Sequence, residues 1–117
     1  MDLLDLVNAL LSYDALTARQ WLADAERSGF AWSKVPAPSG LNPTASALAA
    51  GVTELLASRA GQPPPAWTAK IPAAPQGVFL VRAAETMPRL RALCEQEGPE
   101  PLRRRRLFAP PEFLTHA

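Results

Sequence analysis

The longest stretch in which apolar residues recur with helical spacing begins at Asn42 and predicts a helix that ends near Gly61. Asn42 is a good N-cap, and Pro43 occupies a first-turn position where proline is tolerated. Gly61 suits the left-handed residue after a helix, and the prolines at 63–65 prevent continuation. Trp67, the first large side chain beyond them, must fold back or project outward. The apolar spacing predicts one buried helix face: Ala45, Leu48, Ala49, Val52, Leu55 and Leu56.

Two shorter helices are predicted before this one, over residues 3–11 and 15–28. Asp2 and Asp14 are suitable N-caps, and Gly29 ends the second helix. Only three residues separate the helices, which favours an antiparallel hairpin. Residues 31–41 read as a connector, because they combine two prolines with Ser39 and Gly40. The expected buried positions of the hairpin are Leu3, Leu6, Val7, Leu10, Leu11, Ala18, Trp21, Leu22 and Ala25.

The C-terminal third alternates short apolar runs with turn residues. Residues 68–76 are expected to be irregular, and Val78–Val81 fits a buried strand or a loop crossing the core equally well. A helix is predicted from Thr86 to Glu97, and Glu100–Pro101 can open one further turn. The inner face of the predicted helix consists of Met87, Leu90, Leu93 and Cys94.

Together these patterns predict a mainly α single-domain bundle of four to five helices. One short two-stranded pairing, between Val78–Val81 and Leu107–Phe108, is an additional option. Residues 1–41 would form a hairpin with its connector, and residues 42–117 a module packed on it as one domain.

The composition excludes several classes of protein. The chain has 117 residues, of which 48% are hydrophobic and 20% charged, so it can build one core. A net charge of +1 gives no global attraction to nucleic acid or membranes. No apolar run approaches the ~20 residues that span a bilayer. One cysteine and an acidic N-terminus suit a reducing cytoplasm rather than secretion.

A search for catalytic or metal-binding patterns predicts neither an enzyme nor a cofactor or metal site. The sequence lacks the phosphate-binding loop, the dinucleotide fingerprint and the HExxH zinc motif. His116 is the only histidine and lies next to the C-terminus, where residues are usually solvated. Cys94 has helical spacing with Leu90 and Leu93, which indicates a core position. The carboxylate pairs at positions 2 and 5 and at 95 and 97 lie at helix ends, where solvated charge is ordinary.

The one unusual cluster of charge is Arg103-Arg104-Arg105-Arg106. It can be a solvated turn, a protein interface or a contact to nucleic acid. Consecutive helical residues point about 100° apart, so some guanidinium groups must lie near the apolar neighbours Leu102, Leu107 and Phe108. Arginine tolerates this better than lysine, because it binds carboxylates bidentately and stacks on aromatic rings. The N-terminal hairpin could also be a helix-turn-helix, but its second helix mixes acidic and basic residues on the exposed face.

From Ala45 onward the order of motifs resembles a known family. The motifs are Gly61-Gln62-Pro63-Pro64-Pro65-Ala66-Trp67, then Val78-Phe79-Leu80, then residues 101–108, Pro-Leu-Arg-Arg-Arg-Arg-Leu-Phe. This order is similar to the C-terminal module of bacterial antitoxins encoded beside nucleotidyltransferase-type toxins. The likeness covers residues 45–113. The chain departs from the larger relatives in lacking a convincing helix-turn-helix domain ahead of the module, and its central motif is reduced.

The resemblance implies a cytoplasmic, non-catalytic protein that binds and neutralises a co-encoded toxin. The alternative is a small nucleic-acid-binding regulator that uses the arginine run. A third candidate is a structural subunit or homodimer. Direct nucleic-acid binding is expected to be weak and lost at physiological salt. Carried over by the resemblance are Pro65 and the candidate partner-binding residues Trp67, Phe79, Arg103, Arg104, Arg105, Arg106, Leu107 and Phe108.

Overall fold

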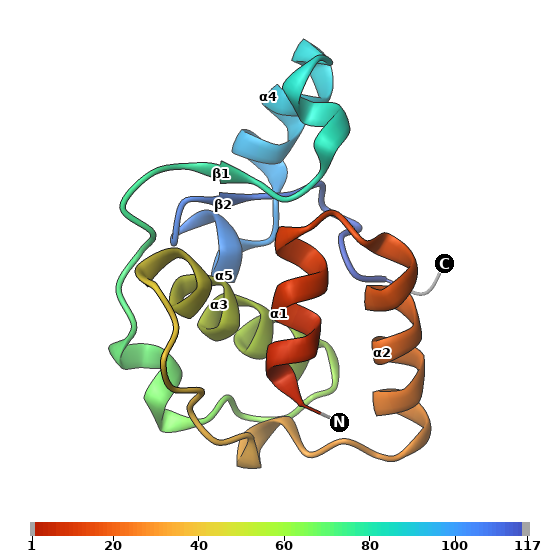
Figure 1. Cartoon of the computed structure of the whole chain (residues 1–117), viewed down its shortest axis with the longest axis vertical. Coiled ribbons are helices and arrows are strands. Elements are labelled where there is room, and N and C mark those ends of the chain that lie inside the picture. Colours follow the sequence, from red (N-terminus) through yellow and green to blue (C-terminus); the bar gives the residue numbers. More distant parts are fainter. Residues whose placement is uncertain (1, 116–117) are drawn as a thin grey trace.

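The computed structural model describes residues 2–115, which form five α-helices, three 3-10 helices (η) and one pair of short strands (Figure 1). The mainly α prediction is therefore confirmed, including the two-stranded pairing. In chain order the elements are α1 (Leu3–Leu11), α2 (Ala15–Arg27), η1 (Trp32–Lys34), α3 (Pro43–Arg59), η2 (Ala66–Lys70), β1 (Val78–Phe79), η3 (Arg82–Glu85), α4 (Pro88–Glu97), α5 (Glu100–Arg103) and β2 (Leu107–Phe108).

The N-terminal hairpin has the predicted caps and packs on the rest of the core through α1. The Asp2 carboxylate accepts a hydrogen bond from the Leu4 amide at 3.0 Å, and Asp14 accepts one from Thr17 at 3.1 Å. The Trp21 indole donates to the Asp2 carbonyl at 2.9 Å, which ties α2 to the start of α1. One predicted core residue is wrong: Leu11, the last residue of α1, is 37% exposed, whereas Ala9 and Leu10 in the same turn are buried.

The central helix α3 corrects the prediction of a single buried face. Its residues are buried on every side from Ala47 to Ala57, because α1, η1, η2 and α5 surround it. Alanine and glycine on the face expected to be exposed leave room for this close approach. A Cβ added at Gly51 would lie 2.8 Å from the Leu102 side chain and 3.1 Å from the Pro101 carbonyl, so α5 packs directly on the backbone there.

The chain folds back after the three prolines. Trp67 is half-buried against the core and its indole donates a hydrogen bond to the Val35 carbonyl at 2.8 Å. This contact joins η2 to the connector that follows α2. The expectation of irregular structure over 68–76 is wrong for its first part, because η2 extends to Lys70.

Strands β1 and β2 pair in parallel, with Val78 opposite Leu107 and Phe79 opposite Phe108. Residues at alternate positions face opposite sides, so Val78 and fully buried Leu107 face the core, while Phe79 and Phe108 occupy the outer side. The chain between the strands forms η3, α4 and α5.

Helix α4 stands apart at one end of the molecule (Figure 1). It begins at Pro88, and the predicted inner face is only partly correct. Cys94 is fully buried, but Leu90 and Leu93 are half-buried outside the main core and Met87 is 51% exposed. The reason is that α4 packs mainly against the short η3 and has few other neighbours.

Candidate partner-binding surface

Arg105 is the centre of a buried polar cluster that holds the C-terminal segments together. Its side chain binds both carboxylate oxygens of Glu54, with Nη1–Oε1 at 2.6 Å and Nη2–Oε2 at 3.0 Å. It also donates to the carbonyls of Thr68, at 2.7 Å, and Pro101, at 3.1 Å. Arg105 and Glu54 are only 5% and 7% exposed. One side chain therefore connects α3, η2 and α5.

The electrostatics of this cluster favour an ionised Glu54. Burial alone would raise the pKa of the Glu54 carboxyl, but the hydrogen bond from Arg105 and the nearby positive charges of Arg105 and Arg104 hold the pKa below its usual value. The carboxylate therefore stays charged and bound at neutral pH.

The other three arginines of the run are bound at the surface. Arg104, whose side chain is 51% exposed, also reaches Glu54. Arg103 donates to the Gln96 carbonyl near the end of α4, and Arg106 donates to the Pro75 carbonyl at 3.2 Å. Arg106 has a positive φ of 64°, which turns the chain from α5 into β2. Each guanidinium thus has an internal partner, and the exposed ones keep free donor groups.

The predicted site residues divide between the interior and the surface. Arg105 and Leu107 are buried, and Trp67 is engaged with the connector, so in this structure all three contact the protein itself. Phe79 and Phe108 lie together on the outer side of the β pair, with ring centroids 5.3 Å apart. The structure therefore leaves Phe79, Phe108 and the exposed arginines as the residues that a partner can reach.

An arginine that sequence reasoning overlooked completes this surface. The Arg91 guanidinium of α4 lies over the Phe79 ring, 4.5 Å from its centroid. This distance is typical of a cation–π contact. Its side chain is 52% exposed and also approaches Glu95 at 3.7 Å. We call Phe79, Phe108 and Arg91 the phenylalanine face.

Glu54 was also missed, although the sequence carried a signal. It is the only charged residue between Asn42 and Ser58, in a run of apolar and small residues. A lone carboxylate in a buried helix requires a basic partner. No equivalent signal identifies Arg91, because its position over Phe79 depends on how α4 packs beside β1.

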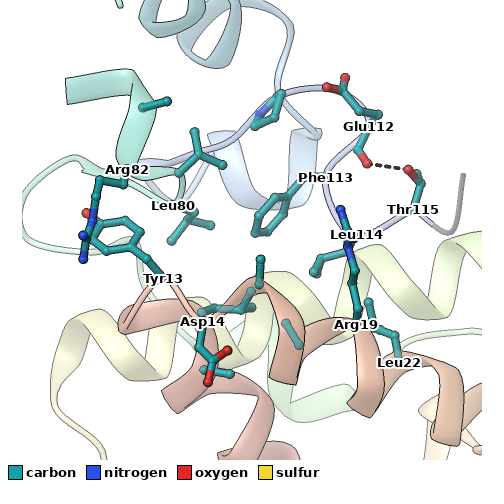
Figure 2. A pocket seen from close by; sticks show the side chains of 17 residues that line it. Tyr13, Asp14, Arg19, Leu22, Leu80, Arg82, Glu112, Phe113, Leu114 and Thr115 are labelled. Carbon is teal, nitrogen blue, oxygen red and sulfur yellow. Dashed lines mark hydrogen bonds between the residues drawn. The ribbon is translucent and has the colours of Figure 1, made fainter. Parts of the chain in front are cut away.

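A separate groove of about 510 Å³ lies between the hairpin and the C-terminal segment (Figure 2). The Phe113 ring projects toward its middle, and Leu80 and Leu114 lie beside it. Two of its charged side chains have local partners: Asp14 caps α2, and the Arg82 guanidinium lies 5.1 Å from the centre of the Tyr13 ring. The groove is therefore a mainly apolar hollow, and Arg19 and Glu112 are the other charged residues in its lining.

The described residues show no constellation that would carry out chemistry. Between positions 2 and 115, no three His, Cys, Asp or Glu side chains gather to hold a metal ion. Burial raises the pKa of the Cys94 thiol, which makes it a poor nucleophile. His116 lies outside the described residues.

Comparison with known protein families, with curated proteins and with solved structures finds no match. Across the described part of the chain, no helix combines the length and apolar character needed to span a bilayer.

Proposed function

We propose that this chain is a non-catalytic, antitoxin-like cytoplasmic protein that binds and neutralises a co-encoded toxin, with a nucleotidyltransferase-type toxin as the first candidate. The observation that supports it best is the phenylalanine face, where two strands and α4 present adjacent aromatic rings with an arginine over one of them. Aromatic residues and arginine are the residue types that contribute most binding energy at protein interfaces.

The family resemblance supports the same proposal in a second way. Its three motifs are far apart in sequence, yet they meet in the fold. Pro65 caps η2, which contains Trp67 and whose Thr68 carbonyl accepts a hydrogen bond from Arg105. Strand β1 pairs with β2, which directly follows the arginine run. The motif residues therefore build one structural unit, and the phenylalanine face is its outer surface.

The proposal is tested by co-expressing the chain with the product of the neighbouring gene. We expect a stable complex and protection of the cells from that product. Arg91→Glu should weaken the complex and reduce protection, because it reverses the exposed charge beside Phe79. Circular dichroism should remain unchanged, since the Arg91 side chain is half exposed and, within residues 2–115, its ion pair is with Glu95 in the same helix.

The matched control is Arg27→Glu. Arg27 is exposed on α2 and pairs with Asp24 within its helix, as Arg91 does with Glu95. The control should bind and protect like the wild type. If Arg91→Glu also binds like the wild type, the phenylalanine face is not the contact. If the neighbour forms no complex at all, the antitoxin proposal fails.

The structure argues against one obvious pair of substitutions as a test of this interface. Reversing both Arg104 and Arg105 would not separate binding from folding, because Arg105 is buried against Glu54. A glutamate at position 105 would place two carboxylates together in the interior and unfold the chain. Loss of binding in that variant would say nothing about the interface.

A further inference from the structure

Helix α4 carries a row of side chains that the described chain covers only in part. Arg89, Leu93 and Glu97 recur every four residues and therefore lie along one ridge of the helix, with Leu90 beside them. Both leucines lie outside the main core. Arg89 and Glu97 are exposed, and their side chains have no ion pair or hydrogen bond within residues 2–115. The ridge is thus basic at one end, apolar in the middle and acidic at the other end.

The charges on α4 also run against its own dipole. Its first turn holds no acidic residue, its last turn holds no basic one, and Met87 at the N-cap offers no side-chain hydrogen bond. Acidic groups are stabilising near a helix N-terminus and basic groups near its C-terminus. Helix α4 therefore gains from a neighbour that supplies negative charge at its start and positive charge at its end.

We propose that α4 is a self-association surface, on which the α4 of a second copy of this chain lies antiparallel, centred on Leu93. Eight residues of helix span about 12 Å, so Leu93 is midway between Arg89 and Glu97. A two-fold axis at Leu93 places Arg89 of each copy against Glu97 of the other, as a symmetric interface requires. The half-buried leucines cover one another, and the two helix dipoles oppose.

The expected association is weak and reversible. Helix α4 has ten residues, and a single helix pair covers less surface than the roughly 1,200 Å² of total buried area at the low end of stable interfaces. A dissociation constant on the order of tens to hundreds of micromolar follows for such a contact. The proposal goes beyond the proposed toxin binding and does not depend on it.

Analytical ultracentrifugation of the full chain over a wide concentration range tests the pairing. The wild type should dimerise reversibly, and Arg89→Glu or Glu97→Arg should each weaken the dimer at least about tenfold, because each creates two like-charge contacts. An equimolar mixture of the two variants should dimerise again. In the mixed dimer, the Arg89→Glu chain is acidic at both ends of the ridge and the Glu97→Arg chain is basic at both ends, so opposite charges meet at each end.

Unfolding cannot mimic this result. Arg89→Glu adds an acidic residue to the first turn of α4, and Glu97→Arg adds a basic residue to the last turn, so both variants favour the isolated helix. Arg19→Glu, an exposed reversal on α2 with the same change in net charge as Arg89→Glu, should leave association unchanged.

Three results would overturn the proposal: a wild type that stays monomeric at millimolar concentration, single reversals that associate like the wild type, or a mixture that associates no better than its components. Arg91 lies roughly 160° around the helix from Leu93. Arg91→Glu therefore probes toxin binding without altering the ridge, and the two proposals can fail separately.

Discussion

Four adjacent arginines have four different environments in this chain, and only the third is buried. Arg105 pairs with Glu54, a residue 51 positions earlier, while its neighbours bind exposed carbonyls or the edge of the same carboxylate. The sequence predicted that some guanidinium groups must lie near apolar anchors. The sequence did not show which guanidinium group is buried. This depends on the turn that follows α5, which directs the Arg105 side chain toward α3.

Breaking this pair should cost much of the stability of the chain. Arg105→Met leaves the Glu54 carboxylate buried without its main counter-ion, and we expect a loss of about 3–5 kcal/mol in the free energy of unfolding. The double variant Glu54→Leu with Arg105→Met removes both charges and should be markedly more stable than Arg105→Met alone. Urea denaturation of Arg105→Met, Glu54→Leu, the double variant and the wild type measures the coupling. If the effects of the two single substitutions simply add, the buried pair does not act as a unit.

The same pair predicts how stability depends on pH. Because the pKa of Glu54 is lower in the folded chain than its usual value of 4.5, its contribution is fully present above that value. The contribution is lost as pH falls through the lower, folded pKa. Melting temperatures between about pH 6 and 3 should therefore drop, and the drop should be smaller for Glu54→Gln, which has no carboxylate to protonate. An equally steep drop in that variant would assign the acid sensitivity to other groups.

Among the elements, α3 shows which structural features a sequence pattern can predict and which it cannot. Its start and end follow from Asn42, Pro43 and the residues around Gly61, and α1 follows from Asp2 in the same way. Local chemistry sets such boundaries, so the sequence predicts them. Burial of α3 on all sides was not predicted, because alanine suits exposed helix faces and close-packed ones alike; the one sign of it was the absence of charged residues other than Glu54 between Asn42 and Ser58. The same limit applies to α4. Its leucines predicted an inner face packed on the core, but the helix lies away from the main core.

Gly51 gives a direct test of how closely α5 approaches α3. Replacing glycine by alanine inside a helix normally stabilises it by roughly 0.5–1 kcal/mol. Here the new methyl group would meet Leu102 and the Pro101 carbonyl, so Gly51→Ala should instead lower the free energy of unfolding by about 1–3 kcal/mol. Ser58→Ala, at an exposed position of the same helix, is the control and should change little. A Gly51→Ala protein as stable as the wild type would show that α5 can move away without cost.

For the molecule as a whole, the distribution of basic groups argues against strong binding to nucleic acid. The net charge is +1, and many hydrogen-bond donors of the arginine run already bind Glu54 or backbone carbonyls. We expect binding to DNA that is independent of sequence and disappears near ~150 mM salt, since each phosphate contact contributes about one unit to the log–log salt dependence. Fluorescence anisotropy with the DNA upstream of its own gene measures this. Nanomolar affinity at that salt would favour the regulator alternative instead.

The parallel pairing of β1 and β2 also has a consequence for how the chain is made. During synthesis the N-terminal part of a protein leaves the ribosome first, so early segments emerge before the later segments that they contact in the folded protein. Glu54, the Thr68 carbonyl and β1 all leave the exit tunnel before their shared partners, which lie between Arg105 and Phe108. Until Arg105 emerges, the nascent chain holds the Glu54 carboxylate in its longest helix without the guanidinium group that binds it in the folded protein. The buried pair and the strand pairing can therefore form only after residues 105–108 have been made.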